Sequence, residues 1–591
     1  MSRRSGRSRL AAAIASCLLV AGCGVPTSSD VEYVGPGPAA GLGSPGEGEP
    51  PPGADDAATP QEQVSNFLQA AAGRPDTADD RVRQFIREVD RQQWDPDGIR
   101  VVRLLGDPVI TEVADGSWRV ELNVQPVGTL RPEGYLDAVT GSRTTRYEFR
   151  VVTEGGGIDG DGRNQPPRLR IAEPPATMLL ADTALTNDRY FFPWPIYFWD
   201  ADHEQLVSDL RWLPQAGESS GQHPLIVVEW LLQGPAPALS RLLQGLPAGS
   251  QLVSPPIWDG NRLVVDLNAA AVGEGQTVEQ LGNQLAWSLL ELRPNSELVL
   301  KIDGRERDFV PRRRSWLSEP VRMAVLDGVV RPLATTDPPL LPVLSEEVNT
   351  GVLAAAVTRS GELAALVRPD GAGRQRLSVV TADDGEATEQ STSLVADVIG
   401  QPAWLSAGDR GAGLVVADGR LYRFTAQGGV DDVPVPGVSG DVTAVAVAPE
   451  RRRLALIAGD VLYMAWLDRE GDSITIQDPR PLPTTLRNLD GVAFSHENRL
   501  VVAGELDDRV WLYQLTVDGG LEEPLRDLGN ASITSLVAHP YEDSNGFESI
   551  MYEADEQAFS FTGAPSRIGV EQLIDAPEET EAAPLSPFFL D

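Results

Sequence analysis

The sequence has few of the side chains that most often act as nucleophiles, general bases or metal ligands. Its 591 residues include only two cysteines and four histidines, and the histidines are spread over three regions. The H-E-x-x-H pattern of zinc hydrolases does not occur. We therefore predict a protein that is not an enzyme and that holds no metal and no cofactor. Carboxylate pairs whose members are far apart in the sequence stay open as a catalytic alternative.

The N-terminus lacks an apolar run long enough to cross a membrane. Residues 10–20 form an apolar run of eleven residues, whereas a transmembrane helix needs about 20. Four arginines precede this run, and no acidic residue occurs before Asp30. A basic start followed by a short apolar core is typical of a secretory signal. We predict that residues 1–22 are a signal peptide.

The signal is followed by a cysteine, in the stretch Val20-Ala21-Gly22-Cys23. This stretch resembles the bacterial lipobox, with Val20, Ala21 and Gly22 before the lipidated residue. The resemblance implies that Cys23 becomes the N-palmitoyl, S-diacylglycerol cysteine of a protein anchored to the extracytoplasmic face of the cell membrane. A plain secretory signal with an incidental cysteine is the alternative. Since Cys17 lies in the segment to be removed, the mature chain has no partner for an intramolecular disulfide.

Positive charge is also scarce. The chain has 49 Lys and Arg, of which Lys301 is the single lysine, against 86 Asp and Glu, and its net charge is -37. Loss of residues 1–22 removes four arginines and makes the charge -41. This balance argues against a nucleic-acid partner, because such binding needs basic groups to neutralise phosphates. It also argues against docking on anionic lipid without a covalent anchor. The preference for arginine over lysine indicates GC-rich coding and an actinobacterial source.

Residues 23–60 and 61–180 differ sharply in composition. The first segment is rich in Gly, Pro, Ala and acidic residues and predicts a flexible linker. In the second, Thr59 and Pro60 are typical of a helix start, and strand-like patterns follow the helices after Gly98. Two helices before a curved antiparallel sheet resemble the nuclear-transport-factor-like α+β cone, which can hold a small molecule.

An acidic group near the second predicted helix has two interpretations. Asp76, Asp79 and Asp80 lie close together in the sequence, as catalytic carboxylates can. They also lie near a helix start, where negative charge favours the positive end of the helix dipole. We expect the second role.

Residues 186–310 predict another α+β domain, which contains four short landmarks. These are Leu231-Leu232-Gln233-Gly234-Pro235, Leu246-Pro247-Ala248-Gly249, Val265-Asp266-Leu267-Asn268 and Ile302-Asp303-Gly304. In this order and spacing they resemble the GerMN domain, a module without a known catalytic set. Each landmark also has a structural explanation. Gly-Pro ends a helix, Pro-x-Gly makes a turn, and Asp266 and Asn268 are expected to bond backbone groups at a strand end.

Two features of this region are candidates for contacts. The aromatic run Tyr190–Trp199 is expected to belong to the core, with an interface patch as the alternative. A basic island follows the domain and contains Arg305, Arg307, Arg312, Arg313 and Arg314. It is either a solvated linker or a contact for an acidic partner or a neighbouring domain. Arg312, Arg313 and Arg314 are the interaction candidates.

Residues 320–575 repeat a pattern of short apolar runs. Val357, Leu405, Val447, Phe494 and Val537 are equivalent, and successive spacings are 48, 42, 47 and 43 residues. About four short strands per repeat at this period predict an all-β propeller. Five blades are clear, and residues 321–330 either complete the ring or contribute to a sixth.

Two further features of the repeat region concern its histidines and its end. His496 and His539 occupy the same repeat position, and we expect structural roles for them, with ligand binding near the channel as the alternative. Residues 576–591 are acidic and predict a loose tail, although residues 587–590 could dock.

The order of lipobox, linker, cone-like domain, GerMN domain and propeller resembles the LpqB family of actinobacterial lipoproteins over essentially the whole chain. The resemblance implies an accessory lipoprotein that modulates a MtrB-like sensor histidine kinase through its extracytoplasmic domain. That role would link it to a two-component system and to envelope and cell-cycle homeostasis. Composition and spacing by themselves indicate only a tethered multi-domain binding protein. An envelope glycan-acting enzyme and an assembly scaffold are the alternatives.

Overall fold

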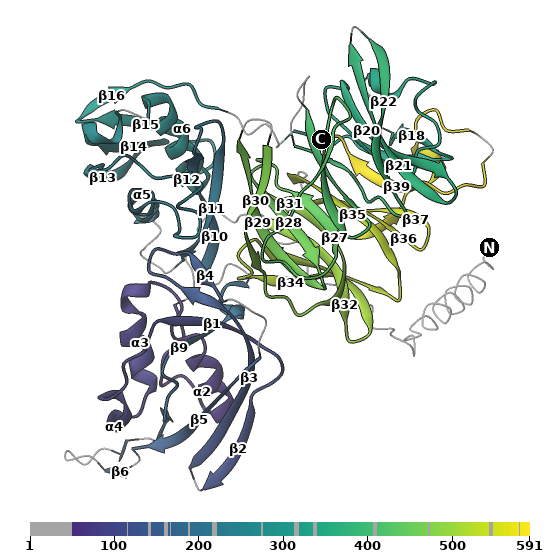
Figure 1. Cartoon of the computed structure of the whole chain (residues 1–591). Coiled ribbons are helices and arrows are strands. Elements are labelled where there is room, and N and C mark those ends of the chain that lie inside the picture. The colour runs from purple at the N-terminus through teal and green to yellow at the C-terminus, as the bar shows by residue number, and fades with distance from the viewer. Residues whose placement is uncertain are drawn as a thin grey trace, which may run out of the picture. The chain divides into compact units, whose positions relative to one another are not determined.

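The computed structural model describes residues 50–591 apart from several short segments. Those segments are 115, 140–143, 156, 159–163, 166, 187–189, 216–221, 274–275, 313–317, 335–339, 384, 406–410, 471–472, 543–547 and 578–579. The described chain folds into two α+β domains followed by a β-propeller (Figure 1). The predicted signal peptide, the lipobox and most of the predicted linker lie outside the described residues.

The N-terminal domain packs short helices against a mostly antiparallel sheet of order β8-β5-β3-β1-β9, in which β1 and β9 are parallel. Strands β2 and β4 also pair with the long strand β3. The elements are α2 (Pro60–Phe67), α3 (Ala78–Phe85), α4 (Glu88–Arg91), β1 (Ile99–Leu104), β2 (Val109–Ala114), β3 (Ser117–Leu130), β4 (Leu136–Ala138), β5 (Thr145–Glu154), β6 (Gly157–Ile158), β7 (Asn164–Gln165), β8 (Arg168–Ala172) and β9 (Met178–Ala181).

The start of α2 shows how the sequence sets this domain. Thr59 accepts a hydrogen bond from the Glu62 amide, and the Glu62 carboxylate accepts one from the Thr59 amide, each at 3.2 Å. This reciprocal cap, with Pro60 at the first helical position, ends the linker and begins the fold. Phe67 of α2 then packs on Phe85 of α3 and on Phe149 of β5. The α+β class is as predicted, and the resemblance to the nuclear-transport-factor-like cone stays a prediction.

The second domain combines a long hairpin with a four-stranded sheet. The hairpin of β10 and β11 pairs with the short β12, and the sheet has the order β13-β14-β15-β16. Strands β14 and β15 are parallel, with α6 between them in the sequence. The elements are β10 (Phe191–Asp200), β11 (Leu206–Pro214), α5 (His223–Gln233), β12 (Leu243–Gln244), β13 (Leu252–Asp259), β14 (Arg262–Leu267), α6 (Val278–Leu289), β15 (Glu297–Ile302) and β16 (Arg305–Arg307).

The sequence landmarks of this domain have the structural roles expected for them. Gly234 ends α5 with a positive φ of 92°, a conformation that glycine adopts without strain. Asp266 accepts a hydrogen bond from the Gly304 amide at 3.0 Å. Asn268 accepts one from the Gln251 amide at 3.1 Å. The two polar side chains therefore satisfy backbone groups at the end of β14, as predicted.

The propeller contains five four-stranded antiparallel sheets, each a simple meander. Its first two blades are β19 (Ala354–Val357), β20 (Leu363–Gly371), β21 (Arg374–Asp383) and β22 (Glu386–Ala396), then β23 (Ala403–Trp404), β24 (Ala412–Ala417), β25 (Arg420–Thr425) and β26 (Val430–Asp432). The next are β27 (Val442–Val447), β28 (Arg453–Ala458), β29 (Val461–Glu470) and β30 (Ser473–Pro481), then β31 (Arg487–His496), β32 (Arg499–Leu506), β33 (Arg509–Thr516) and β34 (Glu522–Gly529). The fifth is β35 (Ile533–Glu542), β36 (Glu548–Ala554), β37 (Gln557–Phe561) and β38 (Pro565–Arg567).

A sixth sheet closes the ring and corrects the prediction of a loose tail at 576–591. Strands β17 (Arg322–Leu326) and β18 (Val329–Pro332) pair with β39 (Leu585–Phe589) in the order β18-β17-β39. Phe588 and Leu590 are each only 2% exposed. The acidic composition of the tail suggested solvent, but its last apolar residues cover the edge of β17 that would otherwise be unpaired. The sixth blade therefore combines both ends of the propeller sequence.

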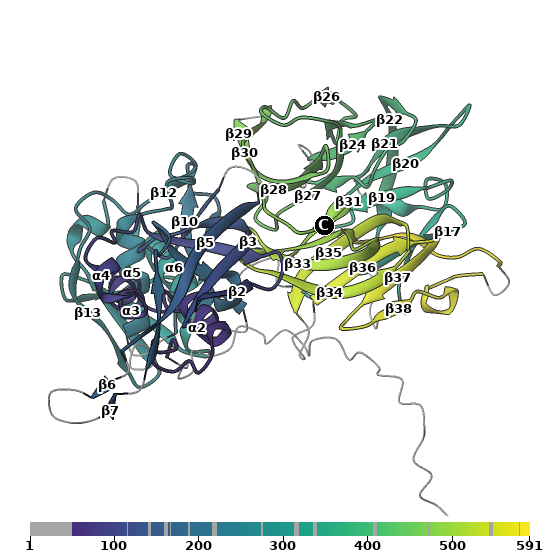
Figure 2. The same ribbon diagram turned by 90° about the horizontal axis from the view of Figure 1, so that it is seen from below.

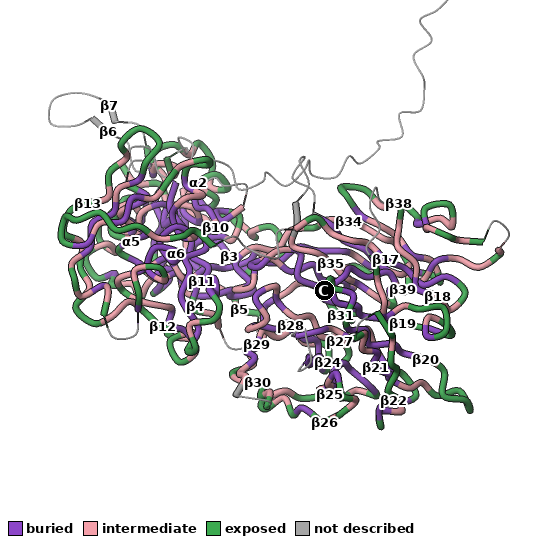
Figure 3. The backbone as a smooth tube through the Cα atoms, turned by 90° about the horizontal axis from the view of Figure 1, so that it is seen from above, coloured by how far each residue is buried: buried purple, intermediate pink, exposed green. Residues whose placement is uncertain are grey.

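Burial within the propeller falls from the second strand of a blade to its outermost strand (Figure 3). The second strands β24, β28 and β32 are largely buried, whereas the outermost strands β22, β26 and β38 are mostly exposed or intermediate. Viewed along the ring in Figure 2, the blades surround the end of the chain. The space at the centre of the ring is therefore the place where residues from all six blades meet.

Candidate functional site

The inner strands of the propeller enclose a cavity of about 580 Å³. Every blade contributes to its wall, and much of that wall is small and apolar, which leaves the centre open. The six blades, in order, contribute the wall residues Ala356, Ala403, Ala446, Ala493, Val537 and Phe589. The polar groups of the cavity come mainly from the loops that follow the inner strands.

Several arginines lie at one mouth of the channel. Arg359, Arg451 and Arg452 come from those loops, Arg469 comes from β29, and all four line the cavity. The turn between β10 and β11 reaches the same mouth through Glu204, which also lines it. Arg452 forms ion pairs across the domains with Asp200 at 2.6 Å and with Glu204 at 3.4 Å. The second domain thus neutralises one arginine of the mouth.

Asp591 follows β39 into the channel and is bonded to three blades. Its amide donates to the Val357 carbonyl at 2.9 Å, and its carbonyl accepts from the Arg359 amide at 2.8 Å. Its carboxylate accepts a hydrogen bond from the Trp404 amide at 3.0 Å and lies 3.6 Å from the Arg451 guanidinium. Burial raises the pKa of this carboxyl, and Arg451 acts in the opposite direction. A carboxylate is therefore held inside the ring.

His539 also lies in the cavity wall. Its ring is 5.5 Å from the ring of Phe589, and its buried Nδ1 has no hydrogen-bond partner among the described residues. Burial lowers the pKa of His539 to about 4, and the nearby guanidinium groups of Arg359, Arg451 and Arg322 add to that effect. The imidazole is consequently neutral near pH 7.

A second polar cluster joins the propeller to the second domain and is sealed from solvent. Arg453 is 3% exposed and donates to the Glu450 carboxylate at 2.6 Å. It also donates to the Glu497 carbonyl at 2.7 Å, to Ser208 Oγ at 3.1 Å and to Asn498 Oδ1 at 3.2 Å. Ser208 belongs to β11, so this one guanidinium fastens two domains.

Other buried contacts extend the same junction. Tyr197 of β10 donates its hydroxyl hydrogen bond to the Glu497 carboxylate. Trp212 of β11 donates from Nε1 to the Asp518 carboxylate at 2.8 Å. Trp466 of β29 is buried within the apolar core of the second domain. The hairpin of β10 and β11 is therefore the element that binds the second domain to the propeller.

The N-terminal domain is also bonded to the propeller through one buried arginine. Arg103 of β1 forms ion pairs at 2.8 Å with Asp182 and with Glu522 of β34. Gln125 of β3 adds a hydrogen bond to the Thr484 carbonyl at 3.1 Å. Burial raises the pKa of Asp182, and the charge of Arg103 opposes that rise. The three domains are linked by partnered polar groups rather than by chain alone.

Comparison with known families finds the same three-part order. A model described as the lipoprotein LpqB N-terminal domain matches residues 51–186. A sporulation and spore germination model, Germane, matches 195–308, and the lipoprotein LpqB beta-propeller model matches 327–542. The chain belongs to the LpqB lipoprotein family.

A named relative agrees with this family over part of its length. Lipoprotein LpqB of Thermobifida fusca (strain YX) is 29% identical over 193 residues, which are 32% of this chain and 28% of the relative. The match thus spans less than a third of that relative.

Solved structures resemble the chain only in broad outline. A nidogen/laminin complex chain has 10% identity and a TM-score of 0.32, covering 46% of this chain and 99% of its own. TolB from Acinetobacter baumannii has 13% identity and a TM-score of 0.30, covering 55% and 75%. Likenesses at this level carry no functional argument.

The predicted site residues of this LpqB-family chain are only partly described. Val20, Ala21, Gly22 and Cys23 lie outside the described residues, as do Arg313 and Arg314. Arg312 is described, and its guanidinium lies 5.5 Å from the ring of Trp199. Its amide donates to Asn283 Oδ1 at 2.6 Å. Arg312 therefore packs on its own domain, and its role as a partner contact stays a prediction.

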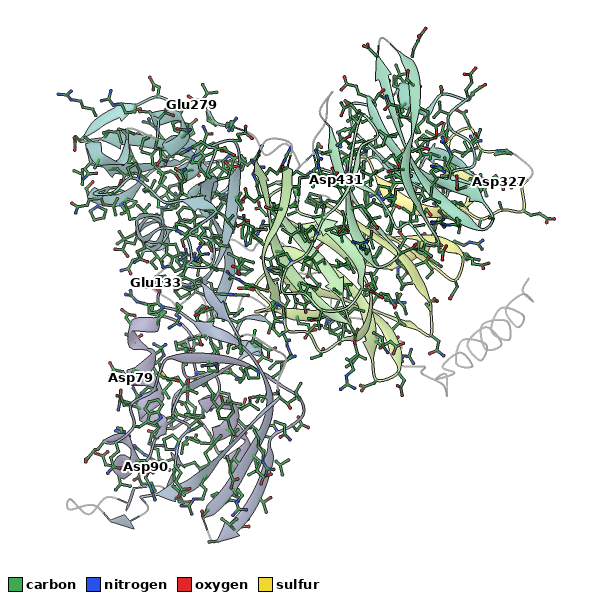
Figure 4. The ribbon with its side chains drawn as sticks, viewed as in Figure 1. Asp79, Asp90, Glu133, Glu279, Asp327 and Asp431 are labelled. Carbon is green, nitrogen blue, oxygen red and sulfur yellow. The ribbon has the colours of Figure 1, made fainter. Side chains whose placement is uncertain are left out.

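The aromatic and acidic candidates have structural roles. The strand β10 is buried along nearly its whole length, which confirms the core assignment for the aromatic run. Asp79 lies on the first turn of α3 and forms an ion pair with Arg83 at 2.7 Å (Figure 4). Asp76 pairs with Arg74 at 2.8 Å. Each aspartate thus pairs with its own arginine, and the carboxylates do not converge on a common site.

Two observations bear on other classes of site. Among the residues that the structure describes, no group of three or more His, Cys, Asp or Glu side chains is arranged to hold a metal ion. In the same part of the chain, no helix has the length and apolar character needed to span a membrane.

Sequence reasoning missed two features of the family member. The first is the channel mouth. Arg359, Pro449 and His539 share one repeat position and all line the cavity, so that shared position was a signal in the sequence for this site. The second is the sequence Gly-Glu-Ser-Ser-Gly at 217–221, which fits the G-x-S-x-G pattern of serine hydrolases. It lies outside the described residues.

Proposed function

We propose that this protein is a lipid-anchored extracytoplasmic lipoprotein that modulates a MtrB-like sensor histidine kinase by direct contact. The anchor is assigned to Cys23, which follows a basic and apolar leader in the sequence. Membership of a lipoprotein family supports that assignment. The partner is the extracytoplasmic domain of the kinase, and the action requires no chemical step.

The buried junctions between the domains are the observation that carries this proposal. Arg453 and Arg103 each bond groups from more than one domain, and both are at least 94% buried by their exposed fractions of 3% and 6%. Domains fastened in this way present their surfaces in a fixed arrangement. A protein that acts by contact needs such an arrangement, because it shifts a kinase only by binding one of its states more tightly than the other.

The predicted anchor and linker explain how a weak contact becomes effective. One acyl chain holds a protein on a membrane only marginally, whereas two or more give stable anchoring. When both partners are held at one membrane, the local concentration of each near the other rises without any new contact. The acidic charge of the chain, -37 in total, is consistent with binding a protein rather than the membrane surface.

In vivo crosslinking from the anchored protein tests the proposal. We expect the sensor-kinase ectodomain among the crosslinked products of the native protein. A Cys23→Ser variant, which keeps every folded domain, is the matched control and is expected to lose most of that product. Recovery of crosslinked products without any sensor kinase would contradict the proposal.

Two other outcomes of the same work identify the alternatives. Crosslinking to envelope assembly proteins alone would indicate a scaffold. Turnover of peptidoglycan fragments by the purified protein would indicate an envelope glycan-acting enzyme. For that outcome Ser219→Ala is the informative variant, because Ser219 is the central serine of the 217–221 pattern.

A further inference from the structure

The channel mouth of the propeller has an excess of positive charge. Among the described residues its acidic groups are Glu204, Glu450 and Asp591, of which Glu204 and Glu450 pair with Arg452 and Arg453 respectively. Arg359 and Arg469 line the cavity and form no ion pair with any described residue, although the Arg359 guanidinium donates to the Glu319 carbonyl at 2.5 Å. Arg451 has the Asp591 carboxylate as its acidic neighbour, at the rather long distance of 3.6 Å. In a chain of net charge -37, such a local excess favours an anion.

The cavity has both the room and the donors that a small anion needs. Its volume of about 580 Å³ lies within the range of small-molecule pockets. The Asp591 side chain already shows how a carboxylate fits there, since it accepts the Trp404 amide hydrogen bond at 3.0 Å beside Arg451. The small side chains of wall residues such as Ala403, Ala446 and Ala493 leave the centre of the cavity open.

We propose that the mouth of the propeller channel binds a small organic anion through a carboxylate. Arg451 and Arg359 supply the charged contacts, and the Asp591 side chain is a resident competitor for the same donors. Carboxylates are favoured over phosphate because the group already held by Arg451 and the Trp404 amide is a carboxylate. The inference does not depend on the contact with a sensor kinase, and either can fail without the other.

The first experiment is calorimetric titration of the full lipoprotein in detergent. The probe is N-acetylglutamate, a dicarboxylate, and its control is the neutral diamide of the same shape. We expect saturable binding of the dicarboxylate at or below about 10 mM, weaker binding as salt is added, and none of the diamide. Absence of dicarboxylate binding, equal binding of the diamide, or equal binding of inorganic phosphate would overturn the proposal.

Two variants that are expected to change the dicarboxylate affinity in opposite directions make the test specific. Arg451→Gln is expected to weaken dicarboxylate binding about tenfold, because it removes a charge-assisted contact. Asp591→Asn keeps the side-chain shape and an acceptor but removes the competing charge, so binding is expected to tighten several-fold. Arg420→Gln is the matched control, since Arg420 is exposed and pairs with Asp432 outside the channel. Its affinity should equal that of the native protein.

The variants can also refute the assignment. Unchanged affinity in Arg451→Gln, or weaker binding in Asp591→Asn, would place the anion elsewhere. If Arg451→Gln does not fold, Arg359→Gln replaces it, because the Arg359 side chain is exposed at the mouth and its amide contact with Asp591 is kept. Unchanged affinity in that variant would equally overturn the proposal.

Discussion

Arg451 and Arg453 lie two residues apart at the start of the second strand of the third blade, yet their surroundings differ completely. Arg453 is 3% exposed and donates to Glu450, Ser208, Asn498 and Glu497. Arg451 lines the channel, where it donates to the Trp404 carbonyl and has its acidic neighbour Asp591 3.6 Å away. A saturated arginine holds domains together, whereas an arginine with spare donors beside a cavity is able to bind something else. The difference separates structural from ligand-binding charge within one loop.

Removal of β39 is expected to have the largest effect. Deleting residues 585–591 removes three buried apolar side chains, Phe588, Phe589 and Leu590, and leaves the edge of β17 unpaired. At about 1.5–3 kcal/mol for each buried side chain, the loss is roughly 5–9 kcal/mol, comparable to the stability of a whole domain. Limited proteolysis should show an open, rapidly cleaved propeller.

A point variant at the end of the deleted segment serves as the control for this deletion. Asp591→Asn removes only the channel carboxylate and keeps the strand, so its proteolysis pattern should match that of the native protein. A truncated protein that resists protease as well as the native one would show that β39 does not close the ring.

Arg453→Leu is expected to rank second, with a loss of about 3–5 kcal/mol in the free energy of unfolding. The substitution leaves the buried Glu450 carboxylate without its cation, and it removes the Arg453 donor from Ser208 Oγ and from the Glu497 carbonyl. Denaturant unfolding followed by tryptophan fluorescence measures the loss. A change below about 1 kcal/mol would mean that the sealed cluster contributes no more than a surface pair.

His539 should give a smaller, pH-dependent effect. Its pKa is about 4 in the folded protein and 6.5 in the unfolded chain, so the unfolded chain binds the proton more tightly. Stability from this group is complete above pH 6.5 and falls as pH drops towards 4, where the loss approaches about 3 kcal/mol. Thermal unfolding of His539→Gln between these pH values should lack this part of the pH dependence. An identical pH profile in the variant would contradict the assignment.

The sequence predicted what depends on local pattern. The propeller repeat, the capped start at Thr59 and the roles of Asp266 and Asn268 follow from periodicity and from short-range hydrogen bonding. The closure of the ring does not, because β39 and β17 are more than 250 residues apart in the sequence and pair only in the folded state. The acidic residues before β39 also concealed its apolar core.

The candidate site was harder to predict for a related reason. Arg451, Arg452 and Arg453 are identical letters in the sequence. Their different partners arise because the hairpin of β10 and β11 covers one side of the loop while the channel lies on the other. Only packing between domains separates a sealed arginine from an available one. The repeat position shared by Arg359 and His539 was the one local hint of a common location.

The most direct test of this account measures stability and dicarboxylate affinity together in Arg451→Gln and Arg453→Leu. The account predicts that Arg451→Gln changes the free energy of unfolding by only about 1 kcal/mol, because the Arg451–Asp591 pair is long, at 3.6 Å, and its side chains are 29% and 25% exposed. The affinity of Arg451→Gln for N-acetylglutamate should nevertheless fall about tenfold. Arg453→Leu should lose stability, and the fraction of it that remains folded should keep the native affinity. The reverse pattern, with Arg451→Gln unstable and Arg453→Leu impaired in binding, would contradict it.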